Sequence, residues 1–193
     1  MLKQTKEEKL YAPVVESLKS IYDYWYLDRS IRYGGKPSDA YRPQSNLSTA
    51  EIKNPHLEIT AHGKFYEELK RHIFNYYMFE QLAAEDLEPD IMGYVRKNTN
   101  KPAFEVITVE IKWGALTLRD LMQAKLYETF FNSKHTFLLS PKGMTGEKMG
   151  VALKYEQVFR GNVIIGMCGG DGKDFKIDPR LAKKIPKEFK RFC

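Results

Sequence analysis

The chain has 193 residues, of which 42% are hydrophobic and 29% charged, with a net charge of +6 and a pI of about 9.1. These values suit one soluble domain with a hydrophobic core, and they exclude a disordered or fibrous chain. No apolar run is long enough for a membrane helix, the N-terminus lacks the apolar stretch of a signal peptide, and two cysteines fit reduced thiols. We therefore expect a cytoplasmic protein whose basic charge favours a polyanionic partner.

The first part of the chain predicts a helix, a strand and a loop. Apolar residues at three- and four-residue steps predict a helix over residues 6–24. Pro13 is awkward inside that helix, which could instead start near Ala12 and hold Pro13 in its first turn. The aromatic and β-branched segment 24–33 favours a strand, and the Gly-, Pro- and Ser-rich segment 34–48 favours a loop.

The middle of the chain predicts a helix followed by a β-hairpin. The helix is expected at about 63–83, where apolar residues recur at helical spacing. The strands are expected at 88–97 and 103–113, and the segment 98–100, Asn-Thr-Asn, is a turn signal between them.

The last part of the chain begins with a capped helix. Thr117 and Asp120 fit the Ser/Thr-x-x-Asp/Glu capping signature, which predicts a helix from about Leu118 to residue 131. The segments that follow are expected to be a strand at 135–140, a loop at 141–150, a strand at 162–168, a turn at 169–174 and a basic tail. The order of elements predicts an α/β fold in which helices flank a central mixed β-sheet.

The strand 103–113 carries two opposite charges on one face. Because side chains alternate along a strand, Glu110 and Lys112 point away from the apolar face formed by Ile107, Val109 and Ile111. One interpretation is a solvated ion pair of little energetic weight. The other is a site in which the carboxylate binds a metal and the lysine assists a nucleophile or an anion.

A third charged residue favours the second interpretation. Pro89 suits the start of a strand, and Asp90 would then lie at the mouth of the hairpin, near Glu110. Two adjacent carboxylates repel unless a cation lies between them, and Mg²⁺ prefers carboxylate and phosphate oxygens. With Lys112 to stabilise negative charge, these residues could hydrolyse a phosphodiester.

These residues resemble the PD-(D/E)XK nuclease superfamily. Pro89-Asp90 followed by Glu110-x-Lys112 is similar to its signature, and the resemblance implies a restriction-endonuclease-like core. Gln123-x-x-x-Tyr127 resembles a motif of RecB-like and lambda-exonuclease-like members. The resemblance implies that Asp90 and Glu110 bind metal and that Gln123 orients the lysine and substrate. It also implies that Tyr127 contacts the nucleic-acid backbone.

Many members complete the metal site with a glutamate from the first core helix. Glu16 is the preferred candidate because its segment resembles the opening helix of archaeal and viral members; Glu67 and Glu68 are the alternatives. With Glu16, the single domain 1–193 has its core at about 6–33 and 84–168. In that case residues 34–83 form an insertion and residues 176–193 a basic tail. With Glu67 or Glu68, the first 60 residues are an extension.

The resemblance implies a Mg²⁺- or Mn²⁺-dependent nuclease that acts on DNA, in the host cytoplasm if the source is viral. It implies no iron–sulfur cluster, because the four cysteines that some members use are missing. A homodimer is expected, since two-fold assembly is common. The alternatives are a nucleic-acid-binding protein that does not cut, and an assembly protein in which the motif is accidental.

Overall fold

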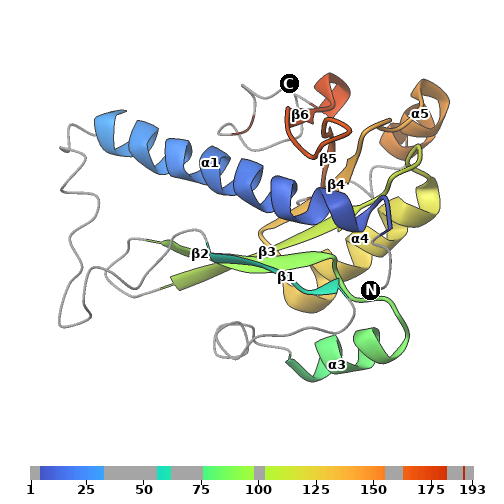
Figure 1. Cartoon of the computed structure of the whole chain (residues 1–193), viewed down its shortest axis with the longest axis horizontal. Helices are drawn as coiled ribbons and strands as arrows, with labels where there is room; N and C mark the ends of the chain where they lie inside the picture. The colour runs from blue at the N-terminus through green and yellow to red at the C-terminus, as the bar shows by residue number, and fades with distance from the viewer. Residues whose placement is uncertain are drawn as a thin grey trace.

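A computed structural model of the chain describes residues 5–32, 56–61, 76–97, 103–154, 163–181 and 189. Within these residues a single sheet of six strands forms the centre of the fold (Figure 1). The elements, in chain order, are α1 (Glu8–Arg32), β1 (His56–Ile59), α3 (Tyr76–Ala84), β2 (Ile91–Lys97), β3 (Ala103–Ile111), α4 (Leu118–Phe131), β4 (His135–Ser140), α5 (Gly146–Lys154), β5 (Val163–Met167), β6 (Lys176–Ile177) and the short 3-10 helix η2 (Pro179–Leu181).

The sheet is mixed, and its strands lie in sequence order from β1 to β6. β1, β2 and β3 pair antiparallel, β3, β4 and β5 pair parallel, and β6 returns antiparallel to β5. α4 makes the crossover that a parallel β3–β4 pair requires. The predicted α/β class, the β2–β3 hairpin and the strands at β4 and β5 are therefore confirmed.

Helices cover both faces of the sheet. α1 lies across one face, and α4 lies on the opposite face (Figure 1). On the α1 side, Leu10, Val14 and Leu18 belong to the same buried cluster as Ile107 and Val109. The side chains of a second cluster meet on the α4 side: Leu82, Met92, Tyr94, Val106, Tyr127 and Phe131. Each fully buried aliphatic side chain contributes roughly 1.5–3 kcal/mol.

The start of α1 is set by a capping box that the sequence prediction missed. The Glu8 amide donates to the Thr5 hydroxyl oxygen at 3.2 Å, and the Thr5 amide donates to the Glu8 carboxylate at 2.5 Å. This reciprocal pair satisfies donors that a helix start leaves open. The alternative start near Ala12 is therefore wrong, and Pro13 lies inside the helix.

The strand predicted at 24–33 is also wrong, because α1 continues through Arg32. β-branched and aromatic residues favour strands only weakly, whereas each residue added to an existing helix gains a hydrogen bond. The sequence contains no glycine or proline between Pro13 and Gly34, so nothing in it stops the helix earlier.

Other differences concern short elements. β1 was not predicted, and it comes from the segment 34–83 that was expected to be an insertion. The loop predicted at 141–150 is wrong from Gly146 onward, because α5 begins there and buries Met149 and Ala152. β6 was missed because it has only two residues.

Several predictions lie partly or wholly outside the described residues. The helix expected at 63–83 is described only as α3, from Tyr76 onward, and the loop at 34–48 is not described. The division into core, insertion and tail stays a prediction. Within the described ranges, no helix combines the length and apolar character needed to cross a bilayer.

The predicted start of α4 is confirmed. Thr117 is the N-cap, its side chain accepts from the Asp120 amide, and the Asp120 carboxylate accepts from the Thr117 amide at 2.7 Å. Asn132 closes the helix in a left-handed conformation, with φ of 48°. These caps fix both ends of the helix that carries Gln123 and Tyr127.

Candidate functional site

The open end of the β2–β3 hairpin brings Asp90 and Glu110 opposite each other. Ile91 pairs with Val109, so the residues one step beyond that pair are Asp90 and Glu110. The Asp90 carbonyl accepts from the amides of Thr60 at 2.9 Å and Ala61 at 3.2 Å. The chain after β1 therefore holds the Pro89-Asp90 turn against the end of the sheet.

Both carboxylate oxygens of Asp90 accept a hydrogen bond. Oδ1 accepts from the Tyr11 hydroxyl at 2.7 Å, and Oδ2 accepts from the Ile111 amide at 2.6 Å. The first donor comes from α1 and the second from the last residue of β3. The orientation of this carboxylate is thus fixed by two elements that are far apart in the sequence.

Glu110 is buried, and its two oxygens have different surroundings. The side chain is 2% exposed, and Oε1 lies 2.6 Å from the Lys112 Nζ. Oε2 is buried and has no hydrogen-bond partner among the described residues. The solvated ion pair that the strand pattern allowed is therefore excluded, because α4 covers this face of β3.

Gln123 and Tyr127 approach Glu110 from α4. The Gln123 amide nitrogen donates to the Tyr127 hydroxyl oxygen at 2.5 Å, and that hydroxyl donates to the Glu88 carbonyl at 3.1 Å. Tyr127 is fully buried, whereas Gln123 is half-buried. Tyr127 has no exposed surface for the expected contact with a nucleic-acid backbone, and its hydroxyl is hydrogen-bonded within the protein.

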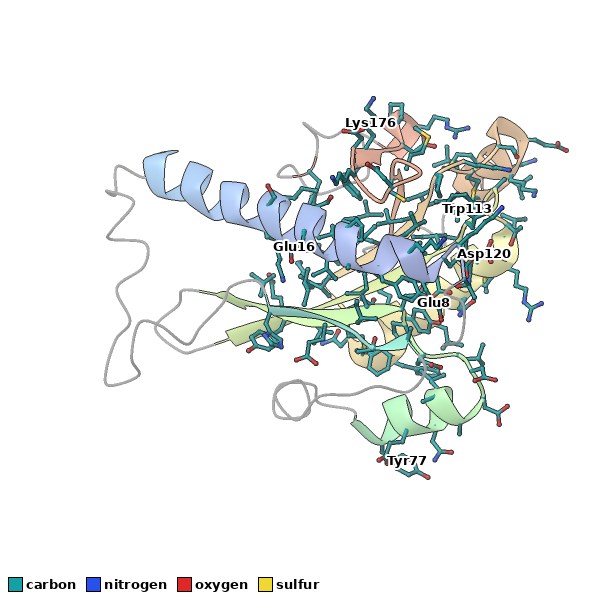
Figure 2. The ribbon with its side chains drawn as sticks, in the orientation of Figure 1. Glu8, Glu16, Tyr77, Trp113, Asp120 and Lys176 are labelled. Atoms are coloured by element: carbon teal, nitrogen blue, oxygen red, sulfur yellow. The ribbon has the colours of Figure 1, made fainter. Side chains whose placement is uncertain are left out.

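Glu16 does not join these residues. It lies on an exposed part of α1, its side chain is 73% exposed, and it pairs with Lys19 at 2.8 Å. Figure 2 shows Glu16 along α1, away from the end of the helix where Glu8 and Trp113 lie. The alternatives Glu67 and Glu68 lie outside the described residues.

Glu7 is the acidic residue from the N-terminal end of α1 that does lie near the site. Its Oε1 accepts from the Trp113 amide at 3.0 Å, one residue beyond Lys112. Its charge also acts on Asp90, Lys112 and Tyr11. The Thr5–Glu8 capping box could have located the helix start beside Glu7, but no sequence pattern links Glu7 to Trp113.

Burial and neighbouring negative charge raise the pKa values of both carboxyl groups. Withdrawal from solvent raises the pKa of Asp90, although the hydrogen bonds from Tyr11 and Ile111 oppose that shift. Burial and the charge of Asp90 raise the pKa of Glu110, while Lys112 and the Tyr127 hydroxyl oppose it. A cation between the two carboxylates would relieve both effects.

Lys112 stays protonated beside Glu110 and Asp90. Burial favours loss of its proton, but the charges of Glu110 and Asp90 outweigh burial, and the pKa of Lys112 is raised. The ammonium therefore supplies positive charge and hydrogen-bond donors. It is not suited to accept a proton as a general base.

The donor set fits a hard divalent cation. Within the described residues, no group of three or more His, Cys, Asp or Glu side chains is arranged to hold a metal. Mg²⁺ needs no such group, since it commonly binds one or two carboxylates and takes its other oxygens from water and phosphate. The Oε2 of Glu110, which has no partner among the described residues, is the donor that such an ion would use, and Asp90 lies opposite Glu110 in the hairpin.

Other reactive side chains lie in structural positions. Burial raises the pKa of the Cys168 thiol to about 11, so it carries no nucleophilic thiolate at neutral pH. His135 is buried beside Phe137 and Phe189 and contacts the Tyr22 hydroxyl at 2.8 Å. His56 stacks on Tyr94 in the sheet.

Compared with family models, curated proteins and solved structures, the chain matches none of them. A function for this protein must therefore be argued from its own residues.

Proposed function

We propose that the chain is a metal-dependent nuclease that hydrolyses phosphodiester bonds of DNA by PD-(D/E)XK chemistry. The observation that carries this proposal is the buried Glu110, opposite Asp90 in the hairpin, with Oε1 paired to Lys112 and Oε2 without a partner among the described residues. A protein rarely buries an incompletely paired carboxylate without a compensating role, since each such group costs free energy. Cation binding is the role that suits this pair.

The arrangement of the fold supports the same proposal. A helix, three antiparallel strands, a crossover helix and a parallel strand, with the strands adjacent in sequence order, is the arrangement expected of a restriction-endonuclease-like core. Asp90, Glu110 and Lys112 lie at one end of the antiparallel strands β2 and β3. Fold alone would not carry the proposal, because one fold can serve many functions.

Each side chain would have a separate role in hydrolysis. Asp90 and Glu110 would hold the ion, which when bound supplies charge that polarises the phosphodiester and makes a water molecule more acidic. Hydrolysis adds the hydroxyl of water to phosphorus and its proton to the leaving oxygen. The Lys112 ammonium would stabilise the negative charge that develops on the phosphoryl oxygens.

Tyr127 and Gln123 would act within the protein rather than on the substrate. Gln123 donates to the Tyr127 hydroxyl, and that hydroxyl donates to the Glu88 carbonyl, two residues before Asp90. This pair would therefore help to hold the segment that carries Asp90 in place.

The experiment is cleavage of end-labelled single-stranded, duplex and branched DNA with Mg²⁺, Mn²⁺ or EDTA. The wild-type chain is compared with Lys112→Ala, and Lys19→Ala is the matched control. Lys19 pairs with Glu16 at 2.8 Å, and its side chain is 31% exposed, against 28% for Lys112. We expect metal-dependent cleavage that falls by about 10²–10³ in Lys112→Ala and is unchanged in Lys19→Ala.

The same assay distinguishes the other functions. Binding of DNA without cleavage in either metal would favour a binding protein that does not cut. A protein that neither binds nor cleaves DNA would contradict the nuclease proposal and the binding-protein alternative alike. The mass of the active species would test the expected homodimer.

A further inference from the structure

Tyr11 is the described residue whose position at the site no sequence motif explains. It lies on α1, is 7% exposed and packs in the main hydrophobic cluster with Leu10 and Val14. A phenylalanine would fill the same apolar space. The hydroxyl, however, extends to the end of the sheet and donates to Asp90 Oδ1 at 2.7 Å.

The surroundings of this hydroxyl are acidic. It donates to Asp90, and Glu7 and Glu110 are also near enough for their charges to act on it. A tyrosine hydroxyl holds its proton at neutral pH, so it is a donor there. A neutral donor directed at one carboxylate among several can fix that carboxylate without neutralising its charge.

The effect on Asp90 is a defined orientation. With Tyr11 on Oδ1 and the Ile111 amide on Oδ2, rotation of the carboxylate would break one or both hydrogen bonds. Ligands of metal sites are commonly held in this way by residues that do not touch the ion. Fixing Asp90 before the ion arrives lowers the entropy lost when the site assembles.

We propose that Tyr11 is a positioning residue, which orients the Asp90 carboxylate for a divalent cation. This inference rests on the proposed function of the site. The two carboxylates are held by different groups: Tyr11 and the Ile111 amide donate to Asp90, and Lys112 pairs with Glu110.

The experiment compares Tyr11→Phe with Tyr22→Phe. Tyr22 is a matched control because it lies on the same helix, is fully buried, and contacts His135 Nδ1 through its hydroxyl at 2.8 Å. Calorimetry would measure Mn²⁺ binding to each protein in the absence of DNA. Cleavage rates over a range of Mn²⁺ concentrations and melting temperatures in EDTA would complete the comparison.

We expect Tyr11→Phe to weaken Mn²⁺ binding by about 10–100-fold, as removal of a group that supports a metal ligand commonly does. The Mn²⁺ concentration for half-maximal cleavage should rise by the same factor, while the rate at saturating Mn²⁺ changes much less. Tyr22→Phe should bind Mn²⁺ as the wild type does, even where its melting temperature falls.

Different results would separate this inference from the proposed function. Equal Mn²⁺ affinity in wild type and Tyr11→Phe, or tighter binding in the variant, would overturn the role of Tyr11 and leave the nuclease proposal intact. If Tyr22→Phe also bound Mn²⁺ more weakly, the role of Tyr11 would be overturned too, because the loss of affinity would then follow from general loosening of α1. A wild-type protein that binds no Mn²⁺ and cuts no DNA would overturn both.

Discussion

The two faces of β3 bury side chains of different character. On the face toward α1, Ile107, Val109 and Ile111 are all fully buried and apolar. On the face toward α4, Thr108 and Glu110 are equally buried but polar. The first face stabilises the sheet in the ordinary way, whereas the second face must satisfy polar groups within the protein.

The polar groups on the second face differ in how completely they are hydrogen-bonded. The Thr108 hydroxyl lies 2.9 Å from that of Thr136 and 3.2 Å from that of Ser133, so it is well paired. Two residues further along, Glu110 has an oxygen with no partner among the described residues. The buried polar groups are therefore fully paired in the middle of the strand, whereas one carboxylate oxygen stays unpaired at its end.

The largest expected effect comes from placing a charge on the apolar face. Val109→Asp would bury a carboxylate among Ile107, Ile111 and the side chains of α1, without a partner such as Lys112. An uncompensated buried charge costs about 3–5 kcal/mol, so the free energy of unfolding measured with urea should fall by that amount.

A matched control for this change is Val151→Asp. Val151 lies on α5 and is 39% exposed, so its free energy of unfolding should change by no more than about 0.5 kcal/mol. If Val109→Asp were no worse than this control, the two faces would not differ as described.

The opposite result is expected for the charge on the polar face. Glu110→Gln keeps the shape of the side chain and an acceptor for Lys112 but removes the buried charge. Without divalent cations at pH 8, the free energy of unfolding should stay the same or rise, while cleavage falls by about 10²–10³.

Glu128→Gln is the control for Glu110→Gln. Glu128 pairs with Lys125 at 2.5 Å on α4. The Glu128→Gln variant therefore loses a similar ion pair away from the site. It should retain cleavage. A large loss of stability in Glu110→Gln would instead indicate that the Glu110–Lys112 pair is structural.

The sequence predicted the parts of this contrast that depend on local pattern. Alternation along 103–113 separated Ile107, Val109 and Ile111 from Thr108 and Glu110, as the structure does. The Thr117–Asp120 signature located the start of α4. Strand pairing between 88–97 and 103–113 placed Asp90 opposite Glu110. These features follow from a period of two and from a short capping signature.

The parts that depend on distant contacts were not predictable from pattern. Nothing in the sequence period shows that α4 would cover the polar face, so Glu110 could be read as solvated. Tyr11 is 79 residues from Asp90, and no spacing rule connects them. Glu7 was missed because no spacing rule connects it to Trp113 or Asp90, and Glu16 was preferred by resemblance alone.

The polar face should also make stability depend on pH. Because the folded-state pKa values of Asp90 and Glu110 are raised, the folded protein holds more protons than the unfolded chain above pH about 4. Without divalent cations, the free energy of unfolding should therefore decrease as the pH rises through those raised values.

Mg²⁺ should reverse this decrease, since metal ligands must be deprotonated. At 100 times its dissociation constant, Mg²⁺ would raise the free energy of unfolding by about 2.7 kcal/mol at pH 8 and by much less at pH 5. Melting temperatures at both pH values, with Mg²⁺ or EDTA, would measure this difference. Asp90→Asn should abolish it, and an equal Mg²⁺ effect at both pH values would contradict the raised pKa values.

The smallest effect we expect distinguishes Glu7 from Glu16. Glu7 accepts from the Trp113 amide at 3.0 Å and acts on the charges of Asp90 and Lys112, whereas Glu16 pairs with Lys19 on the exposed part of α1. Glu7→Gln should lower cleavage about tenfold, or about 1.4 kcal/mol, because it removes a negative charge from the site. Glu16→Gln should leave cleavage unchanged. Both variants are measured at subsaturating Mg²⁺. A larger loss of cleavage in Glu16→Gln than in Glu7→Gln would instead indicate that Glu16 completes the metal site.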